Sequence, residues 1–271
     1  MKKSEFEKLV VLDFEATCDE DNPPLPQEII EFPSVLLDGA TLDPIDEFES
    51  FVRPIHHPTL RAFCTELTGI EQKDVDAAPT FPAVLERHLE WLRSHGLPTE
   101  GDLPYAIVTC GDWDLKTCLP TQLRACAIDF VAAPYRRWIN VKVPFKRWKR
   151  KPAGMKRMLE ALGIELEGRH HRGIDDSRNI AKIVKALVAR NQAMEITTEL
   201  SPSRYPPITI LLEREGRKSE VHLNRRAMGT LLGAASGAFR REAKRAFVGD
   251  RELVDDADLV DLRSGALVRV A

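Results

Sequence analysis

The stretch "VVLDFEATC", Val10 to Cys18, runs from an apolar, β-branched segment directly into two acidic residues. Its first half, up to Phe14, has the length and composition of a fully buried strand. Asp13 and Glu15 are two residues apart, so on a regular strand they share one face, about 7 Å apart along the chain. Ionised carboxylates are costly to bury without a cation or hydrogen-bond donors. The stretch therefore predicts a strand end with a pair of acids that need a positive partner.

The bulk composition is that of an ordinary globular protein: 271 residues, 43% hydrophobic, 30% charged, with a formal net charge of −3. This balance excludes a histone-like polycation but not a nucleic-acid enzyme, because basic residues can gather on one face. The five cysteines have no C-x-x-C spacing, which argues against a structural zinc site and favours a reducing compartment. No apolar run is long enough for a signal peptide or a membrane span. We therefore expect a cytoplasmic protein without membrane contact.

Strand-like and helix-like segments alternate through the first 200 residues. Apolar runs predict strands, and apolar stripes with a period of 3.6 residues predict helices. The expected strands are 10–14, 28–38, 44–54 and 105–111, with the second and third forming a hairpin, and the expected helices are 79–96, 154–164 and 174–191. This alternation predicts a three-layer α/β domain at residues 1–200.

A crowded group of prolines, Pro202, Pro206 and Pro207, follows this domain and predicts a linker at residues 201–207. The remaining residues, 208–271, read as strand, strand, helix, strand and strand. The pattern near the C-terminus resembles the second half of a ubiquitin-like β-grasp domain. We expect a small α+β domain here, which would serve as an interaction module for a protein partner.

Further acids occur at two other places in the first domain. In "TCGDWDLKT" a buried strand ends before Asp112 and Asp114, and either could be a functional acid or, in the case of Asp114, a helix cap. In "GRHHRGIDDSRNIAKI", Asp176 lies four residues before Ile180 on the apolar stripe, while Asp175 points aside. A carboxylate aimed into a core needs a cation or donors, so Asp176 is the stronger candidate.

A loop histidine, His171, lies five residues before Asp176. An imidazole with a pKa near neutrality suits general-base catalysis. The acids Asp13, Glu15, Asp114 and Asp176 come from strand ends and an inward helix face, which can meet at one sheet edge. Hard oxygen ligands of this kind suit Mg²⁺ or Mn²⁺. Two such ions about 4 Å apart could clamp a phosphodiester.

Several motifs together closely resemble the DEDDh 3′-to-5′ exonuclease superfamily (RNase T-like), in particular the branch that trims the ends of histone mRNA, ribosomal RNA and small RNAs. These motifs are "VLDFEATC", "EIIEFPSVLL", "LTGI", "APTFPAVL", "WDLKTCL", "WINVK" and "GRHHRGIDDSRNIAKI". The resemblance runs from about residue 8 to residue 192. It implies an RNase H-like, three-layer exonuclease fold with a mixed sheet.

The resemblance also implies roles for single residues. Asp13, Glu15 and Asp176 would hold the first metal ion. Asp13 would bridge to a second ion, and Asp114 would complete that second site. His171 would take a proton from the attacking water. The family pattern favours Asp114 over Asp112, and it favours His171 over its neighbour His170.

Substrate contacts are expected next to the metal acids. Phe14, Ala16 and Thr17 would lie close to the terminal sugar. Leu67 and Trp113 are candidates for packing on the last base, because stacking tolerates any base. The basic run "YRRWINVKVPFKRWKRK", residues 135–151, would guide the incoming strand through phosphate contacts.

The sequence thus predicts a metal-dependent 3′-to-5′ exoribonuclease that uses Mg²⁺ or Mn²⁺ as two ions. It would release nucleoside 5′-monophosphates from single-stranded or overhanging RNA 3′ ends. One alternative is a 3′-to-5′ exonuclease of DNA or of very short oligonucleotides. An alternative from another class is an inactive RNA-binding or adaptor protein that recruits a partner through residues 208–271.

Overall fold

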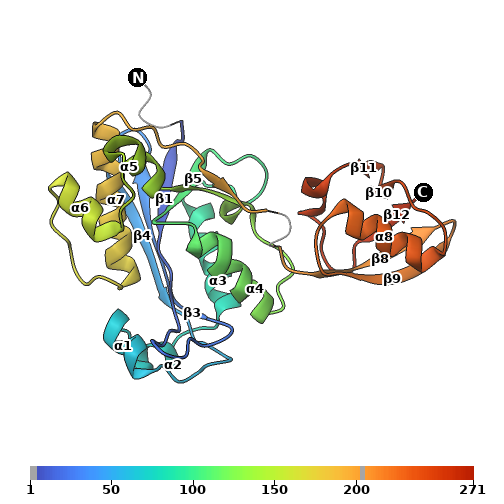
Figure 1. The fold of residues 1–271 in the computed structure, drawn as a ribbon, viewed down its shortest axis with the longest axis horizontal. Helices are drawn as coiled ribbons and strands as arrows, with labels where there is room; N and C mark the ends of the chain where they lie inside the picture. The colour runs from blue at the N-terminus through green and yellow to red at the C-terminus, as the bar shows by residue number, and fades with distance from the viewer. Residues whose placement is uncertain (1–4, 202–204) are drawn as a thin grey trace. The chain divides into compact units, whose positions relative to one another are not determined.

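The computed structural model describes residues 5–201 and 205–271, and the chain divides into two compact units (Figure 1). The first unit comprises the residues up to 122 together with 132–199, and the second comprises 123–131 together with 200–271. The linker predicted at 201–207 contains positions 202–204, which lie outside the described residues. The two units are described separately below.

The first unit is built on a mixed sheet of seven strands, in the order β2-β3-β1-β5-β6-β7, with β4 paired to β3. Strand β1 is antiparallel to β3 and parallel to β5, while β5 and β6 are parallel. The strands are β1 (Lys8–Leu12), β2 (Glu15–Ala16), β3 (Ile29–Asp38), β4 (Pro44–Phe51), β5 (Tyr105–Thr109), β6 (Arg137–Asn140) and β7 (Thr198–Glu199). The predicted β3–β4 hairpin and the mixed sheet are confirmed.

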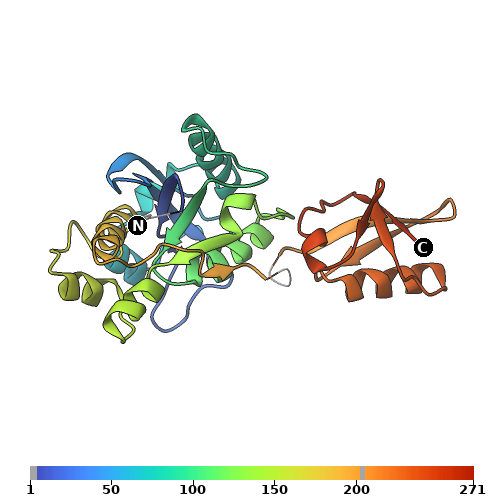
Figure 2. The same cartoon turned by 90° about the horizontal axis from the view of Figure 1, so that it is seen from above.

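Helices cover both faces of this sheet (Figures 1 and 2). Side chains alternate between the two faces of β3. Val35 therefore packs in the cluster with α7, whereas Ser34 points to α3 and bonds its His88. The helices are α1 (Ala62–Thr68), α2 (Gln72–Asp76), α3 (Phe81–Ser94), α4 (Leu119–Ala125), α5 (Lys142–Lys149), α6 (Met155–Leu162) and α7 (Gly173–Ala189).

The long helix α7 follows the sequence pattern closely. Its apolar stripe is buried against β1 and β3, and each buried aliphatic side chain contributes about 1.5–3 kcal/mol relative to exposure. The buried stripe consists of Ile180, Ile183, Val184, Leu187 and Val188. This packing fixes the helix against the sheet, so the N-terminal turn of α7 is held at the end of β1.

His88 on α3 is a core residue. Its Nε2 lies 2.9 Å from Ser34 Oγ, and its Nδ1 lies 2.7 Å from the Tyr135 hydroxyl. Burial lowers the pKa of His88 to about 3, so the ring is neutral. The histidine therefore ties α3 to the sheet through its two hydrogen-bond contacts.

The opening strand differs from the sequence prediction. It ends at Leu12, and Glu15 and Ala16 form a separate short strand, β2, that pairs with β3. The register shifts between Glu15 and Ala16, which marks a bulge-like irregularity. Asp13 and Phe14 lie in the break between the two strands. The strand predicted at 10–14 is present as β1, but its predicted end is wrong by two residues, and the spacing of a regular strand does not apply to Asp13 and Glu15.

The second unit has a five-stranded sheet in the order β11-β10-β12-β8-β9, with β8 and β12 parallel. Its elements are β8 (Ile208–Arg214), β9 (Arg217–Leu223), α8 (Met228–Phe239), β10 (Ala246–Val248), β11 (Arg251–Leu253), a 3₁₀ turn (Asp256–Leu259) and β12 (Leu267–Val270). The single strand predicted at 246–253 is wrong, because Gly249 adopts a φ of 59° and the segment forms a tight hairpin. In the described parts of both units, no helix combines the length and apolar character needed to cross a bilayer.

Candidate active site

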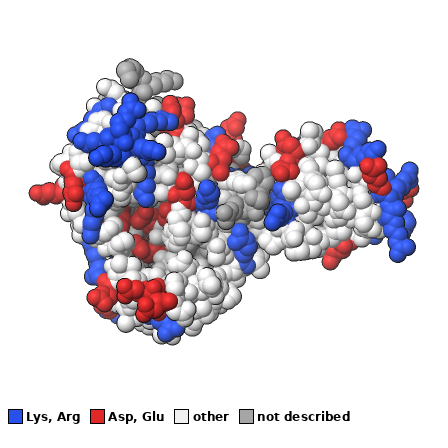
Figure 3. Space-filling model, in the orientation of Figure 1, with Lys and Arg blue, Asp and Glu red and all other residues white. Residues whose placement is uncertain are grey.

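Three carboxylates from separate elements meet at the end of β1. Asp13 follows β1, Glu15 belongs to β2, and Asp176 lies in the first turn of α7. One oxygen from each of them lies within 4.8 Å of the others. The space-filling view shows acidic atoms at the bottom of a hollow in the surface of the first unit (Figure 3). Residues far apart in the sequence thus form one acidic cluster that is open to solvent.

Asp114 joins this cluster from the next strand. It opens a π-helical turn, Asp114–Cys118, which begins five residues after the end of β5, and it is 5% exposed. Its Oδ1 accepts a hydrogen bond of 2.9 Å from the backbone N–H of Phe14, the residue between Asp13 and Glu15. This bond ties the start of the π-helical turn to the segment that carries the other two acids.

The neighbouring acid, Asp112, has a different task. Its Oδ1 accepts three hydrogen bonds of 3.0 Å, from Trp138 Nε1, Asn140 Nδ2 and Thr198 Oγ1. These donors lie on β6 and β7, so Asp112 fastens the end of β5 to the adjacent strands. An oxygen that is already saturated with donors is a poor metal ligand. The geometry therefore supports the choice of Asp114 over Asp112.

The four clustered acids raise one another's proton affinity. Burial, followed by repulsion from Asp114 and Glu15, holds the pKa of Asp13 well above its usual range. Burial, Glu31 and Asp176 raise the pKa of Glu15 to about 9, and burial raises that of Asp114 to about 6. Within residues 5–201 and 205–271, no Lys or Arg forms an ion pair with Asp13, Glu15 or Asp114. The cluster lacks a cation, and a divalent ion with oxygen ligands would supply it.

A buried glutamate, Glu31, positions α7 relative to β1. Its carboxylate accepts hydrogen bonds from the backbone N–H groups of Gly173 (3.0 Å) and Ile174 (3.2 Å), and it pairs with Arg172 Nε at 3.2 Å. A Cβ on Gly173 would come within 2.7 Å of the Asp13 carbonyl oxygen, so only glycine permits this close approach. These contacts set the distance between Asp13 and the acid of α7. Glu31 is not among the residues predicted from the sequence, although an acid inside the apolar run "EIIEF" is a signal of a buried carboxylate that needs donors.

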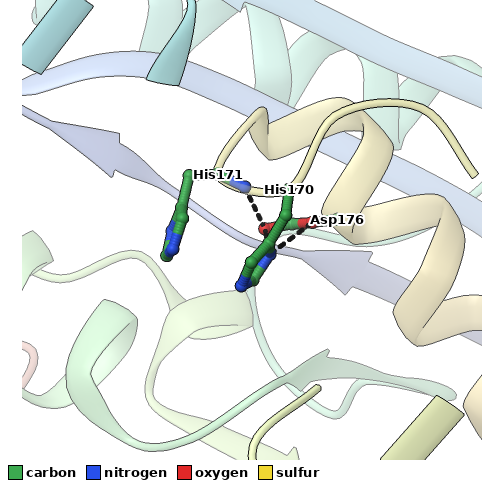
Figure 4. A group of neighbouring side chains, drawn as sticks. All are labelled: His170, His171 and Asp176. Atoms are coloured by element: carbon green, nitrogen blue, oxygen red, sulfur yellow. Dashed lines mark hydrogen bonds and ion pairs between the residues drawn. The ribbon is translucent and has the colours of Figure 1, made fainter. Parts of the chain in front are cut away.

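The two histidines before α7 both contact Asp176 (Figure 4). His170 Nδ1 lies 3.0 Å from Asp176 Oδ2, and the backbone N–H of His171 donates to the same oxygen at 2.9 Å. His171 has a φ of 66°, which turns its ring alongside that of His170, with 3.9 Å between the ring centroids. Burial and the neighbouring His170 lower the pKa of His171. Its imidazole is therefore neutral at pH 7 and can accept a proton.

The predicted substrate contacts fall into two groups. The side chains of Phe14, Ala16 and Thr17 are buried, so a nucleotide can reach these residues only at their backbone atoms. Trp113, by contrast, is 40% exposed beside Asp114, and Leu67 is half-buried on α1. These two side chains remain available for contact with a base.

Comparison with known proteins agrees with this geometry. The family model described as "Exonuclease" (RNase T type) matches residues 10–184, about two thirds of the chain, and this range includes all four acids and His171. The chain belongs to this exonuclease family. The resemblance noted from the sequence motifs is confirmed.

Within the exonuclease family, the chain is similar to named exoribonucleases. It is 42% identical to human ERI1 exoribonuclease 3 over 199 residues, which cover 72% of this chain and 57% of that protein's length. The solved nuclease domain of 3′hExo, a DEDDh family member bound to rAMP, has 37% identity and a TM-score of 0.68 over 72% of this chain and 98% of that one. A structure of 3′-end recognition of the histone mRNA stem-loop by a 3′-exonuclease has 34% identity and a TM-score of 0.68, over 80% of this chain and 71% of that one.

The DEDDh exonuclease fold implies divalent metal ions. The residues present fit such ions, because Asp13, Glu15 and Asp176 offer three hard oxygen ligands within 4.8 Å of one another. Burial, followed by repulsion from neighbouring carboxylates, raises the pKa of Asp13 and Glu15, and a shared cation would offset both effects.

Proposed function

We propose that this protein is a metal-dependent 3′-to-5′ exoribonuclease that releases nucleoside 5′-monophosphates from single-stranded RNA ends. The observation that carries the proposal is the convergence of Asp13, Glu15 and Asp176 within 4.8 Å beside His171. The names of the similar proteins support RNA as the substrate. Because the chain spans 57% of the length of that human relative, its activity is proposed from the site it contains.

In the proposed reaction, two ions, Mg²⁺ or Mn²⁺, would be held by Asp13, Glu15, Asp114 and Asp176. Such ions polarise the scissile phosphate and stabilise the attacking and leaving oxygens. His171 accepts a proton from the attacking water, whose oxygen bonds to phosphorus. The bond from phosphorus to the 3′ oxygen of the preceding nucleotide breaks, and that oxygen takes up a proton from water to become a 3′ hydroxyl. The products are a nucleoside 5′-monophosphate and an RNA that is one nucleotide shorter.

The buried Glu31 keeps these groups in place during the reaction. Glu31 holds the N-terminal turn of α7, and with it Asp176, against the end of β1. The Asp176 carboxylate in turn accepts a hydrogen bond from the backbone N–H of His171. His171 and Asp176 therefore belong to one hydrogen-bonded unit at the start of α7. A displacement of about 1 Å in such a unit costs about 10²-fold in rate.

The strand would approach over the basic side chains of α5. Lys146, Arg147, Lys149 and Arg150 are exposed there, and Lys142 at the start of α5 lowers the pKa of Asp114. Figure 3 shows basic side chains gathered above the acidic hollow. Phosphate contacts on this surface would weaken as salt rises. Trp113 and Leu67 would pack on the terminal base.

We also propose that residues 1–200 form the nuclease domain and that residues 208–271 form a β-grasp domain used for partner binding. The sheet order β11-β10-β12-β8-β9 supports this assignment. Two antiparallel hairpins flank the central parallel pair of β8 and β12. A helix follows the first hairpin, as the β-grasp pattern requires.

The test is a time course with 3′-labelled and 5′-labelled RNA and DNA oligomers in Mg²⁺, Mn²⁺ or EDTA. We expect immediate release of the 3′ label as a mononucleotide, gradual shortening of the 5′-labelled RNA, and no reaction in EDTA. Asp176→Asn should be inactive. Asp102→Asn, which changes an exposed acid of the same unit, is the matched control and should be fully active.

The other outcomes separate the alternatives. A faster reaction on DNA than on RNA would make the protein a DNA exonuclease. Activity confined to oligomers of a few nucleotides would make it an oligonucleotidase. Binding of RNA without cleavage, in any divalent ion, would favour the inactive adaptor. Full activity in EDTA would refute the metal site.

A further inference from the structure

A pair of cysteines lies directly behind the metal-binding strand. Cys18 follows β2 by two residues, and Cys64 lies on α1. Cys18 packs against the small apolar cluster that contains Cys64, and both residues line the same cavity. All five cysteines of the chain are free thiols in this structure. Two segments separated by more than forty residues thus bring these two cysteines to one cluster and one cavity.

A cavity gives small molecules a path to this pair. Its volume is about 490 Å³, and its wall includes Thr17, Cys18, His56, Leu60, Arg61 and Cys64. Glu28 fixes one side of it, accepting backbone N–H bonds of 2.7–2.8 Å from Ile55, His56 and His57. Cys18 is partly exposed, while Cys64 is buried behind it. An oxidant that enters the cavity therefore meets the pair from the Cys18 side.

The chemical environment distinguishes Cys64 from the other buried thiols. The neighbouring Cys18 thiol lowers the pKa of Cys64 to about 7, and the same interaction raises the pKa of Cys18 well above its usual range, so Cys64 is the more acidic thiol of the pair. Burial alone raises the pKa of Cys110 to about 12 and also raises that of Cys118. A thiolate is the reactive form of cysteine, and a neighbouring thiol resolves the oxidised product.

We propose that Cys18 and Cys64 are a reversible oxidation site at which a peroxide forms a disulfide that slows the nuclease. The thiolate of one cysteine attacks a peroxide oxygen, the O–O bond breaks, and a sulfenic acid and one water form. The other thiol attacks the sulfenic sulfur, the S–O bond breaks, and a second water leaves. The two thiols together lose two electrons and two protons, and one H₂O₂ becomes two H₂O.

The effect on the nuclease follows from the position of the pair, and this part rests on the proposed function. The Cys64 thiol lies 3.7 Å from the carbonyl oxygen of Ala16, the residue after Glu15. A disulfide removes that donor and draws the segment from Ala16 to Cys18 toward α1. Since a shift of about 1 Å in a catalytic group costs about 10²-fold, we expect a roughly tenfold to hundredfold slower release of nucleotides.

The test treats the full-length protein with H₂O₂, blocks free thiols with N-ethylmaleimide, and maps the peptides by mass spectrometry. The expected result is a Cys18–Cys64 cross-link, lost activity, and recovery of both free thiols and activity in dithiothreitol. Cys18→Ser should form no cross-link and should keep its activity in peroxide. Cys64→Ser is the second variant, and Cys126→Ser, a change at a half-buried thiol in neither segment, is the control that should behave like the wild type.

Two results would overturn the proposal. One is that both cysteines are still alkylated after peroxide treatment that oxidises an exposed thiol standard. The other is that the cross-linked protein degrades RNA at the rate of the reduced protein. The peptide map does not depend on activity. A reduced protein that is inactive on every nucleic acid would therefore refute the proposed function without obscuring whether the disulfide forms.

Discussion

Replacement of Asp13 by asparagine should stabilise the metal-free protein while abolishing its activity. The side chain of Asp13 accepts no hydrogen bond from the residues that the structure describes, so the change to an amide loses none. It removes a charge that lies within 4.8 Å of carboxylate oxygens of Glu15 and Asp176. A single substitution should thus have opposite effects on stability and on catalysis.

The magnitude follows from Coulomb's law. Two unit charges 4.8 Å apart repel by about 3 kcal/mol at an effective dielectric constant of about 20. Carboxyl groups with a raised pKa are partly protonated at neutral pH, and this relieves part of the repulsion. We therefore expect Asp13→Asn to gain about 1–3 kcal/mol in EDTA at pH 8, or about 2–10 °C in Tm.

The gain should depend on pH with a definite sign. A carboxyl group whose folded pKa is raised keeps its proton in the folded state after the unfolded chain has lost it. The folded state therefore loses stability as pH rises from the ordinary value near 4.5 toward the folded value, which for Glu15 is about 9. At pH 5 the wild-type acids are largely protonated, and the advantage of Asp13→Asn should disappear.

The assay is thermal unfolding followed by tryptophan fluorescence, in EDTA and in Mg²⁺. All four tryptophans lie in the first unit, so the signal reports on the nuclease alone: Trp91, Trp113, Trp138 and Trp148. Mg²⁺ should raise the Tm of the wild type at pH 8 and have little effect on the variant. Asp102→Asn is the control for a lost surface acid. An Asp13→Asn protein that is less stable than the wild type at pH 8 in EDTA would refute the electrostatic reasoning.

Three further substitutions test the roles assigned above. His171→Ala should slow nucleotide release by roughly 10²–10⁴-fold, the usual share of a general base, with an unchanged Tm, and an unchanged rate would remove it from the mechanism. Asp112→Ala leaves three hydrogen-bond donors without their acceptor and should lower the free energy of unfolding in urea by about 2–4 kcal/mol. Asp114→Asn should abolish activity without such a loss of stability. Glu31→Ala should lower both stability and activity, and a variant with wild-type kinetics would show that α7 is positioned without it.

Local pattern alone was sufficient for the elements that support the site. The stripe of α7 placed Asp176 on the buried face, and the structure has that residue 3% exposed. The hairpin of β3 and β4 was also evident from two apolar runs around a turn. These features depend on neighbours within one or two turns of chain, so the sequence carries them directly.

Two local predictions failed because backbone geometry at one residue outweighed the pattern. The first strand breaks after Leu12, and the strand expected at 246–253 folds back at Gly249. The first break coincides with Asp13, and Gly249 is followed by the charged residues Asp250, Arg251 and Glu252. The hydrophobic pattern locates a strand, but it does not give the residue at which a register shift or a positive φ ends it.

By itself, the sequence determined which acids occur, their order along the chain, and the apolar faces that carry them. Tertiary structure alone decided that Asp13, Glu15 and Asp176 come within 4.8 Å, that Asp112 is a structural anchor, and that Glu31 holds α7 in place. The physical reason is that the local pattern around a carboxylate does not say which distant donors and charges it will meet. Its role is set by donors and charges from strands and helices that are distant in sequence, and these meet only when the sheet register and the docking of α7 are fixed.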